Sequence, residues 1–234
     1  MTKSLSALLA AIVTIAAGPG LPNDCTGCSF ANRQLRGVNL AGVAYVGVDF
    51  ARSDLRSADF RRATLTGVDF NDADLRGADL RGAKLIGIDF HGSNVGGANF
   101  AGAVLTGVSL RGVTLEGLDL SGVSLVGSDL RDTKAHGVRF AGGDLEGVDF
   151  ESADLRDASL RNAKLCSRNT EADSSRPFDS RTHCADFRGA NLQGADLRGA
   201  LVCSGGSQPR RCETIGADEL RAASNSNLSG AILQ

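Results

Sequence analysis

The sequence predicts an all-β solenoid in which the chain turns a corner every five residues. Three features indicate this fold. Large apolar residues recur at every fifth position, and Gly usually follows two positions later. When every fourth five-residue unit is grouped together, Phe occurs in some of the four groups and is absent from the others. A period of five matches neither the 3.6 of a helix nor the 2 of a strand, so neither element could bring these side chains to one core. Successive turns of such a chain stack about 4.8 Å apart through strand-type hydrogen bonds.

The large apolar residue is taken as the centre of each five-residue unit. From Phe30 to Leu165 the chain has 28 such centres, and 25 of them are Leu or Phe, so the pattern is nearly unbroken. The residue two before each centre is small or apolar almost throughout. We therefore expect these two positions to point inward and the other three outward, with Gly at the corner because its backbone is unrestricted.

Phe is distributed among the centres in a way that indicates four sides to each coil. Every fourth centre would then stack on the same side, and one such column is rich in Phe. The columns that contain Leu35 and Tyr45 have no Phe at all, which a bare five-residue repeat would not require. Seven continuous coils are therefore expected from about residue 28 to residue 166. The Phe-rich column is Phe30, Phe50, Phe70, Phe90, Leu110, Leu130 and Phe150.

Units such as 58–62 (ADFRR), 73–77 (ADLRG) and 195–199 (ADLRG) resemble the A-(D/N)-L-x-x signature of the pentapeptide repeat protein family. The resemblance covers most of the chain, from Phe30 to Val202. It implies a right-handed quadrilateral β-helix with four units per coil. We expect about 7 continuous coils within residues 21–166, followed by one or two coils that loops interrupt.

Residues 1–20 are interpreted as a signal peptide. Leu5 to Ala17 carries no charge, is too short to span a bilayer, and is followed by the helix-breaking run Gly18, Pro19 and Gly20. The alternative is a hydrophobic N-terminal helix that caps the domain. A cleaved signal predicts an extracytoplasmic protein, either periplasmic, lumenal or secreted, with no other membrane association.

Two insertions interrupt the repeat in the C-terminal part, residues 167–234, which ends in a terminal cap. Cys166 and Cys184 bracket the insertion 167–183, and Cys203 and Cys212 bracket the insertion 204–211. In an uninterrupted repeat the members of each pair would be adjacent, so we expect the disulfides Cys166–Cys184 and Cys203–Cys212. A four-thiolate zinc site is the alternative, although these spacings lack the C-x-x-C units of structural zinc.

Cys25 and Cys28 fall on inward positions of the first coil, where they could pair and cap the end of the solenoid. C-x-x-C is also a redox motif, but no thioredoxin-like βαβ pattern surrounds it.

No catalytic constellation, cofactor motif or metal site is evident in the sequence. His91, His136 and His183 are expected at the surface, and the many Asp residues next to the centres are expected to form solvated ladders beside Arg. A net charge of -2 excludes a strong field for nucleic acid or membrane. We therefore expect a protein that is not an enzyme and that binds neither a cofactor nor nucleic acid.

Two functions from different classes remain. The first is an exported structural scaffold that binds a protein partner or itself through a flat side. The second is implied by the family resemblance, since some members mimic DNA and bind type II topoisomerases. That role requires a strongly acidic cytoplasmic protein, so the near-neutral charge and the signal peptide disfavour it.

One side of the predicted coil is nearly free of charge at its outward positions. We expect this side to be an interaction strip, with Lys84 as its single charge; the alternative is that its β-branched residues reflect strand preference alone. It consists of Ala44, Val46, Thr64, Thr66, Ile86, Val104, Thr106, Ser124 and Val126.

Overall fold

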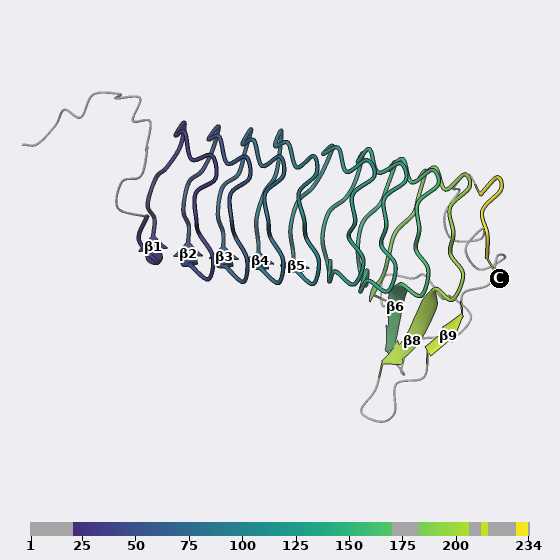
Figure 1. Ribbon diagram of the computed structural model, residues 1–234. Helices are drawn as coiled ribbons and strands as arrows, with labels where there is room; N and C mark the ends of the chain where they lie inside the picture. The colour runs from purple at the N-terminus through teal and green to yellow at the C-terminus, as the bar shows by residue number, and fades with distance from the viewer. Residues whose placement is uncertain (1–20, 170–182, 206–211, 215–227, 234) are drawn as a thin grey trace, which may run out of the picture.

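The computed structural model describes residues 21–169, 183–205, 212–214 and 228–233. The described chain is a parallel β-solenoid without helices, so the predicted fold class is confirmed. Its coils stack into a rod that runs from the purple N-terminal end to the yellow C-terminal end in Figure 1. The predicted signal peptide, residues 1–20, lies outside the described residues.

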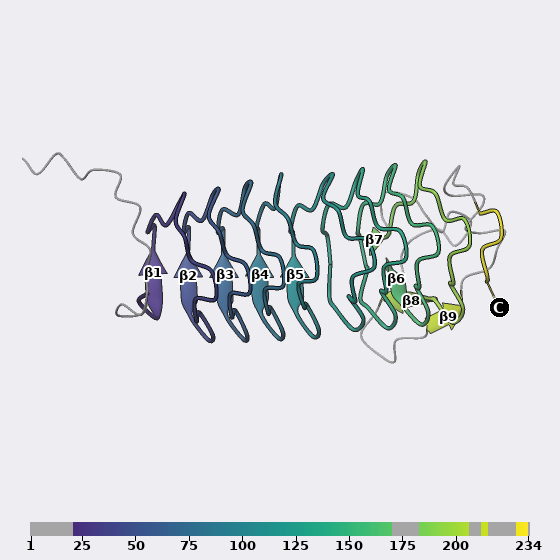
Figure 2. The same cartoon turned by 45° about the horizontal axis from the view of Figure 1, so that its top comes forward.

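One side of the rod is a five-stranded parallel sheet in the order β1-β2-β3-β4-β5. Figure 2 shows its strands side by side in one row. Each strand pairs with the equivalent strand of the next coil: Cys25 pairs with Tyr45, and Tyr45 pairs with Leu65. The strands are β1 (Asp24–Thr26), β2 (Ala44–Val46), β3 (Thr64–Thr66), β4 (Lys84–Ile86) and β5 (Val104–Thr106).

The other three sides are held by isolated parallel bridges with the same step. The ladder on the side of the Phe column begins at Ser29 and Asp49, continues to Asp149, and then passes the first insertion to Asp186. Four such ladders establish the predicted four-sided coil. The coil count differs slightly from the expected one, and parts of the last coils lie outside the described residues.

The corners are turns in which the carbonyl of a centre accepts a hydrogen bond from the N–H three residues on. Val38 N donates to Leu35 O at 3.0 Å, and the residue before Val38, Gly37, has a φ of 68°. Left-handed backbone of this kind favours Gly, which explains its recurrence two positions after the centre. Arg52 and Arg62 adopt the same conformation at corners that lack Gly, with φ of 57° and 58°.

The Asp that precedes many centres helps to form the corner as well as carrying charge. Its Oδ1 accepts a hydrogen bond from the backbone N–H two residues on, as Asp49 does from Ala51 N at 2.9 Å. Asn39 accepts one from Ala41 N in the same way, at 3.1 Å. Only a short side chain can make this local bond, which explains why Asp and Asn recur at this position. A solvated charge alone would not favour Asp over the longer Glu.

The core is a set of stacked side-chain columns, as the repeat predicts. Phe50 and Phe70 stack with ring centroids 5.6 Å apart and an interplanar angle of 8°, and Phe70 and Phe90 are 5.3 Å apart. Phe187 continues the column beyond the first insertion and stacks on Phe150 at 5.2 Å. The insertion therefore leaves the core stack continuous.

A second sheet, in the order β7-β6-β8-β9, is built at the two insertions. Its parallel pair β6 and β8 contains a register shift between Lys164 and Cys166, so that Cys166 lies opposite Val202 and Ser167 opposite Cys203. Regular repeat spacing would have paired Cys166 with Cys203. The strands are β6 (Lys164–Asn169), β7 (His183–Cys184), β8 (Leu201–Gly205) and β9 (Cys212–Thr214).

We expect Phe70→Ala to destabilise the protein by about 3–5 kcal/mol, because the stacked rings on both sides cannot collapse into the cavity. Phe70 is fully buried, whereas the Arg76 side chain is 52% exposed. Arg76→Ala should therefore change the midpoint of urea unfolding far less. Similar losses in the two variants would show that the inward and outward positions are assigned incorrectly.

Candidate interaction surface

The outward face of β2–β5 carries most of the exposed large apolar side chains of the described chain. Val46 is 49% exposed, Ile86 43% and Val104 39%, and the fourth such residue is Ile232. Ala44, Thr64 and Thr106 are also exposed, whereas Thr66, Ser124 and Val126 are half-buried. Exposed apolar residues are ordinary when scattered, but here three of four share one sheet face.

Strand pairing brings the residues of the strip into two parallel rows. Val46 is paired with Thr66, Thr66 with Ile86, and Ile86 with Thr106. The second row contains the residues two positions before those of the first row in the sequence, and it reaches Ser124 through the bridge between Ser124 and Val104. Lys84 is the one charged member of this second row. The members of each row lie about 4.8 Å apart, which makes a flat and continuous surface.

Charges and the second sheet bound the strip at its C-terminal end. On the next coils of the same side, Lys164 Nζ lies 2.5 Å from Glu146 Oε2 and 3.4 Å from Asp144 Oδ2. Lys164 begins β6, and Figure 1 shows β6, β8 and β9 displaced from the body of the rod. The apolar strip therefore ends at a charged border and a projecting sheet.

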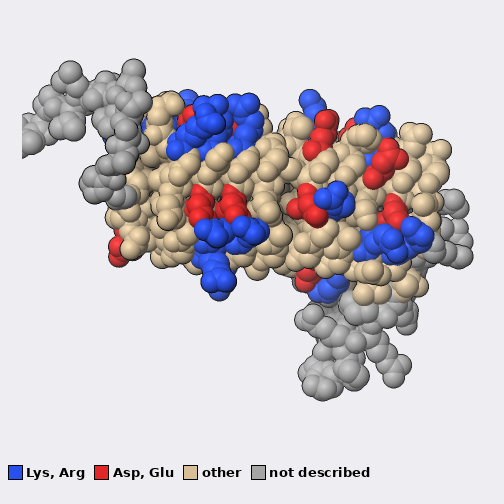
Figure 3. Space-filling view, viewed as in Figure 1, with Lys and Arg blue, Asp and Glu red and all other residues tan. Residues whose placement is uncertain are grey.

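Two of the remaining sides carry acidic and basic side chains that neutralise each other within single units. Arg56 Nη2 donates to Asp54 Oδ2 at 2.5 Å, and Arg76 Nη2 donates to Asp74 Oδ2 at 2.6 Å. The hydrogen bond from Arg56 lowers the pKa of the Asp54 carboxyl group. Figure 3 shows several such clusters of red and blue side chains separated by uncharged surface. These two sides expose paired charges, which contrasts with the strip, while the side of the Phe column carries Asp49, Asp69 and Asp89 without an ion pair among the described residues.

Asp119 has a carboxyl group whose pKa is strongly lowered by an arginine of the next coil. Arg139 Nη2 donates to Asp119 Oδ2 at 2.9 Å, and Ser121 N donates to Asp119 Oδ1 at 3.0 Å. Mainly because of the hydrogen bond from Arg139, the pKa of Asp119 falls to about 2. This carboxylate therefore stays charged across the physiological range.

The structure joins Cys25 with Cys28 and Cys166 with Cys184 by disulfides. The backbones of Cys203 and Cys212 are paired directly opposite each other in β8 and β9, but their side chains lie outside the described residues. Cys25 and Cys166 are buried. The register of β6 and β8 offsets Cys166 from Cys203 by one residue, and Cys166 is joined to Cys184 by a disulfide.

The two histidines whose side chains are described lie apart at the surface. His136 Nε2 lies 3.0 Å from Asp157 Oδ2 at the surface, His91 is exposed, and the side chain of His183 lies outside the described part of the chain. Among the described residues, no group of three or more His, Cys, Asp and Glu side chains could hold a metal ion. Nor does that part of the chain contain a helix of the length and apolarity needed to cross a membrane.

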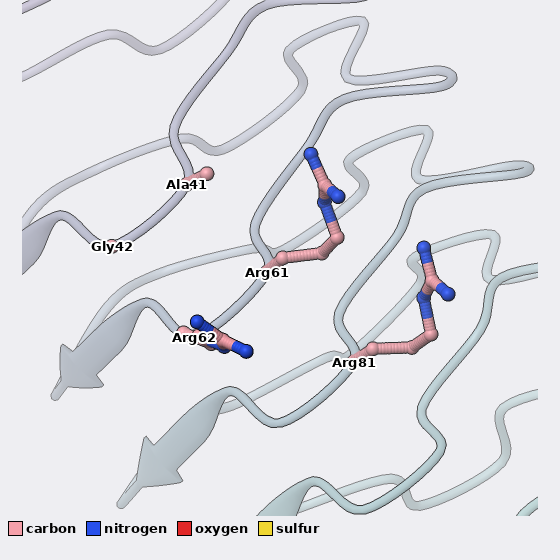
Figure 4. Close-up of a pocket in the computed structure, with 5 residues that line it drawn as sticks. All are labelled: Ala41, Gly42, Arg61, Arg62 and Arg81. Carbon is pink, nitrogen blue, oxygen red and sulfur yellow. The ribbon is translucent and has the colours of Figure 1, made fainter.

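A hollow that the repeat pattern did not lead us to expect lies beside the strip, lined by Ala41, Gly42, Arg61, Arg62 and Arg81. Figure 4 shows Arg61 and Arg81 extending in parallel from adjacent coils, while Arg62 extends from the corner. The signal for it is present in the sequence, since Arg61 and Arg81 occupy equivalent positions of successive coils and Arg62 occupies a corner where Gly is usual.

Comparison with known families gives a match to the pentapeptide repeats model over more than half of the chain. A search of curated proteins gave no significant match. The matched segments are 34–72, 46–82, 73–94, 83–122, 96–132, 136–167 and 183–201.

Several solved structures are similar to this chain. One is HetL, a pentapeptide repeat protein involved in heterocyst differentiation regulation from Nostoc sp. strain PCC 7120, with 26% identity and a TM-score of 0.65 over 90% of this chain and 83% of that one. Trypsin-treated QnrB1, a plasmid-mediated fluoroquinolone resistance protein, has 17% identity and a TM-score of 0.42 over 90% and 82% of the two chains. A thylakoid-lumen pentapeptide repeat protein from Arabidopsis thaliana has 27% identity and a TM-score of 0.28 over 54% and 68%.

We expect Arg139→Gln to raise the pKa of Asp119 from about 2 toward its ordinary value, as measured by carboxyl NMR titration. A depressed pKa contributes stability that is complete above about pH 4 and is lost as the pH falls through about 2. The stability difference between the two proteins should therefore shrink over that interval. Arg111→Gln removes a comparable ion pair, with Asp132, and should leave the pKa of Asp119 unchanged. An unmoved Asp119 pKa in Arg139→Gln would contradict the assignment.

Proposed function

Since this chain belongs to the pentapeptide repeat proteins, we propose that it is an exported, non-catalytic scaffold that binds a protein partner or a second copy of itself. The proposed contact surface is the strip on β2–β5. The observation that carries this proposal is the concentration of exposed Val46, Ile86 and Val104 on one flat sheet.

The physical argument rests on the cost of desolvation. On the other sides, a partner would have to cover paired charges such as Asp54 and Arg56, and burying ion pairs costs more than surface pairing returns. Covering the strip removes mostly methyl groups and Thr hydroxyl groups from water, and Lys84 can extend toward the solvent. Association through the strip therefore has the lowest desolvation cost of the four sides.

The size of the strip fits the apolar centre of an interface rather than a whole one. Its rows run from Ala44 to Ser124, roughly 20 Å at strand spacing. A stable interface buries about 800 Å² on each partner and has a polar rim around its centre. The charged residues Asp144, Glu146 and Lys164 would supply part of that rim. The projecting β6 and β8 would limit how far a partner extends toward the C-terminal end.

The topoisomerase-binding alternative is not favoured by the charge arrangement. A DNA mimic needs long rows of unneutralised carboxylates, but Asp54, Asp74 and Asp154 each pair with an Arg of the same unit. The row Asp49, Asp69 and Asp89, which has no ion pair among the described residues, is confined to three coils of one side and continues as Ser109. The net charge of -2 agrees with this neutralisation.

Export is the second part of the proposal, supported by the apolar segment Leu5 to Ala17 and by the two disulfides. Mass spectrometry of the native protein should find cleavage between about residues 16 and 24 and no free thiol among the 6 cysteines. An intact Met1 together with reduced cysteines would refute export.

The strip is tested by the triple substitution Val46→Lys, Ile86→Lys and Val126→Lys, which places three charges in the row that begins with Val46. Association of the protein, measured by analytical ultracentrifugation and by cross-linking in the native extracytoplasmic fraction, should be abolished because the apolar contact is lost. Circular dichroism and the unfolding midpoint should show an intact fold.

The matched control adds three lysines to outward positions of a different side, as Ala101→Lys, Ser121→Lys and Ala141→Lys. This control should associate as the wild-type protein does. If wild type neither self-associates nor captures a partner, and the strip variant behaves identically in both assays, the strip reflects strand preference alone.

A further inference from the structure

The hollow lined by arginines has the features of an anion site. We propose that Arg61, Arg62 and Arg81 bind a tetrahedral oxyanion, either free phosphate or the phosphate group of a larger molecule. Arg61 and Arg81 project from the side next to the strip, and Arg62 occupies the corner that leads into β3. The inference is independent of the function proposed for the strip.

The shape of the hollow results from small residues on one flank. Its volume is about 540 Å³. The coil before the arginines has Ala41 and Gly42 at the equivalent positions, and apart from Gly42 and its two chain neighbours no heavy atom of the described residues lies within 4 Å of where a Cβ on Gly42 would be. On the other flank, Arg62 Cγ lies 3.7 Å from the corresponding point on Gly82. The stem of Arg62 therefore lies against the following coil, which leaves the space beside Gly42 open.

Two of the guanidinium groups are fixed in orientation by carboxylates of their own units. Asp59 accepts hydrogen bonds from Arg61 Nε at 2.9 Å and Nη2 at 2.6 Å, and Asp79 accepts the same pair from Arg81 at the same two distances. Arg61 Nε also lies 3.8 Å from Asp79 Oδ2, which links the two coils. A guanidinium has five N–H donors, so each arginine keeps donors for a ligand. Figure 4 shows the two side chains lying parallel.

The charge of this region is positive on balance. Asp59 and Asp79 offset Arg61 and Arg81, but Arg62 forms no ion pair with an acidic side chain among the described residues. The flanking coils carry Asn39 and Asn99 where the middle coils carry aspartate, so these positions add no further carboxylate.

These features favour phosphate over a carboxylate ligand. Planar guanidinium groups pair with phosphate oxygens through two parallel hydrogen bonds, and a phosphate offers more acceptor oxygens than a carboxylate does. Two pre-oriented guanidinium groups and one arginine without a carboxylate partner can therefore contact a phosphate from more than one direction. The hollow is also wider than a single phosphate, so the group can enter while attached to a larger molecule.

The proposal is tested by isothermal titration of the purified full chain with inorganic phosphate, phenyl phosphate and acetate, in Tris chloride at constant ionic strength. Both phosphates should bind at least roughly tenfold more tightly than acetate. Arg62→Gln should weaken phosphate binding by about tenfold, since it removes the cation without a carboxylate partner. The double variant Arg61→Gln with Arg81→Gln should weaken it further.

The matched control is Arg52→Gln, because Arg52 occupies the same kind of corner, with the same left-handed backbone, on another side of the rod. It should change the affinity less than about twofold. Tighter binding of phenyl phosphate would identify a phosphate ester as the ligand class, whereas equal binding would identify free phosphate. Absence of phosphate binding by the wild-type chain, or equal weakening by Arg62→Gln and Arg52→Gln, would overturn the site.

Discussion

The backbone hydrogen bonds that join each coil to the next are the constraint on which the rest of this structure depends. Leu55 N donates to Asp74 O at 2.8 Å, and Asp74 N donates to Ser53 O at 3.0 Å, so Asp54 lies opposite Asp74, and the same register holds along the continuous coils. Every side chain therefore belongs to a column that runs along the rod. An inward-facing column must contain residues that stack, as Phe50, Phe70 and Phe90 do. An outward-facing column repeats the shared property of its side chains, such as charge or apolarity, along the rod.

This repetition along each column explains how a chain of ordinary composition has sides that differ in charge and apolarity. Thr or Val at one outward position would have little effect, but Val46, Thr66 and Ile86 in register produce a continuous apolar row. Asp and Arg in register would repel their own kind at strand spacing, and pairing between the two columns relieves this repulsion. Arg56 illustrates it, since it contacts Asp54 in its own unit and lies 3.7 Å from Asp74 in the next coil.

The fold was predictable because the five-residue period and the segregation of Phe by every fourth unit are both visible in the chain. The positions of the strip residues also followed from the repeat period. The repeat period could not predict the places where the structure departs from the regular repeat. The register shift at Lys164–Cys166 occurs where the repeat is interrupted and β7 pairs with β6, and the hollow beside Arg62 depends on where a long side chain lies. Ser53 and Thr133 depart from the apolar pattern of the core, and burial suits them because their hydroxyl groups donate to the carbonyls of Phe50 and Leu130.

The insertions show how this architecture separates stability from surface chemistry. Phe187 stacks on Phe150 although the first insertion lies between them in sequence, so the core column tolerates an interruption at a corner. The disulfide between Cys166 and Cys184 closes the neck of that insertion and keeps the adjoining coils in place. Because the carbonyls and N–H groups of the ladder carry the fold, outward residues are free to vary from one coil to the next. The apolar strip and the arginine hollow can therefore lie on neighbouring sides of the same coils without altering the packing beneath them.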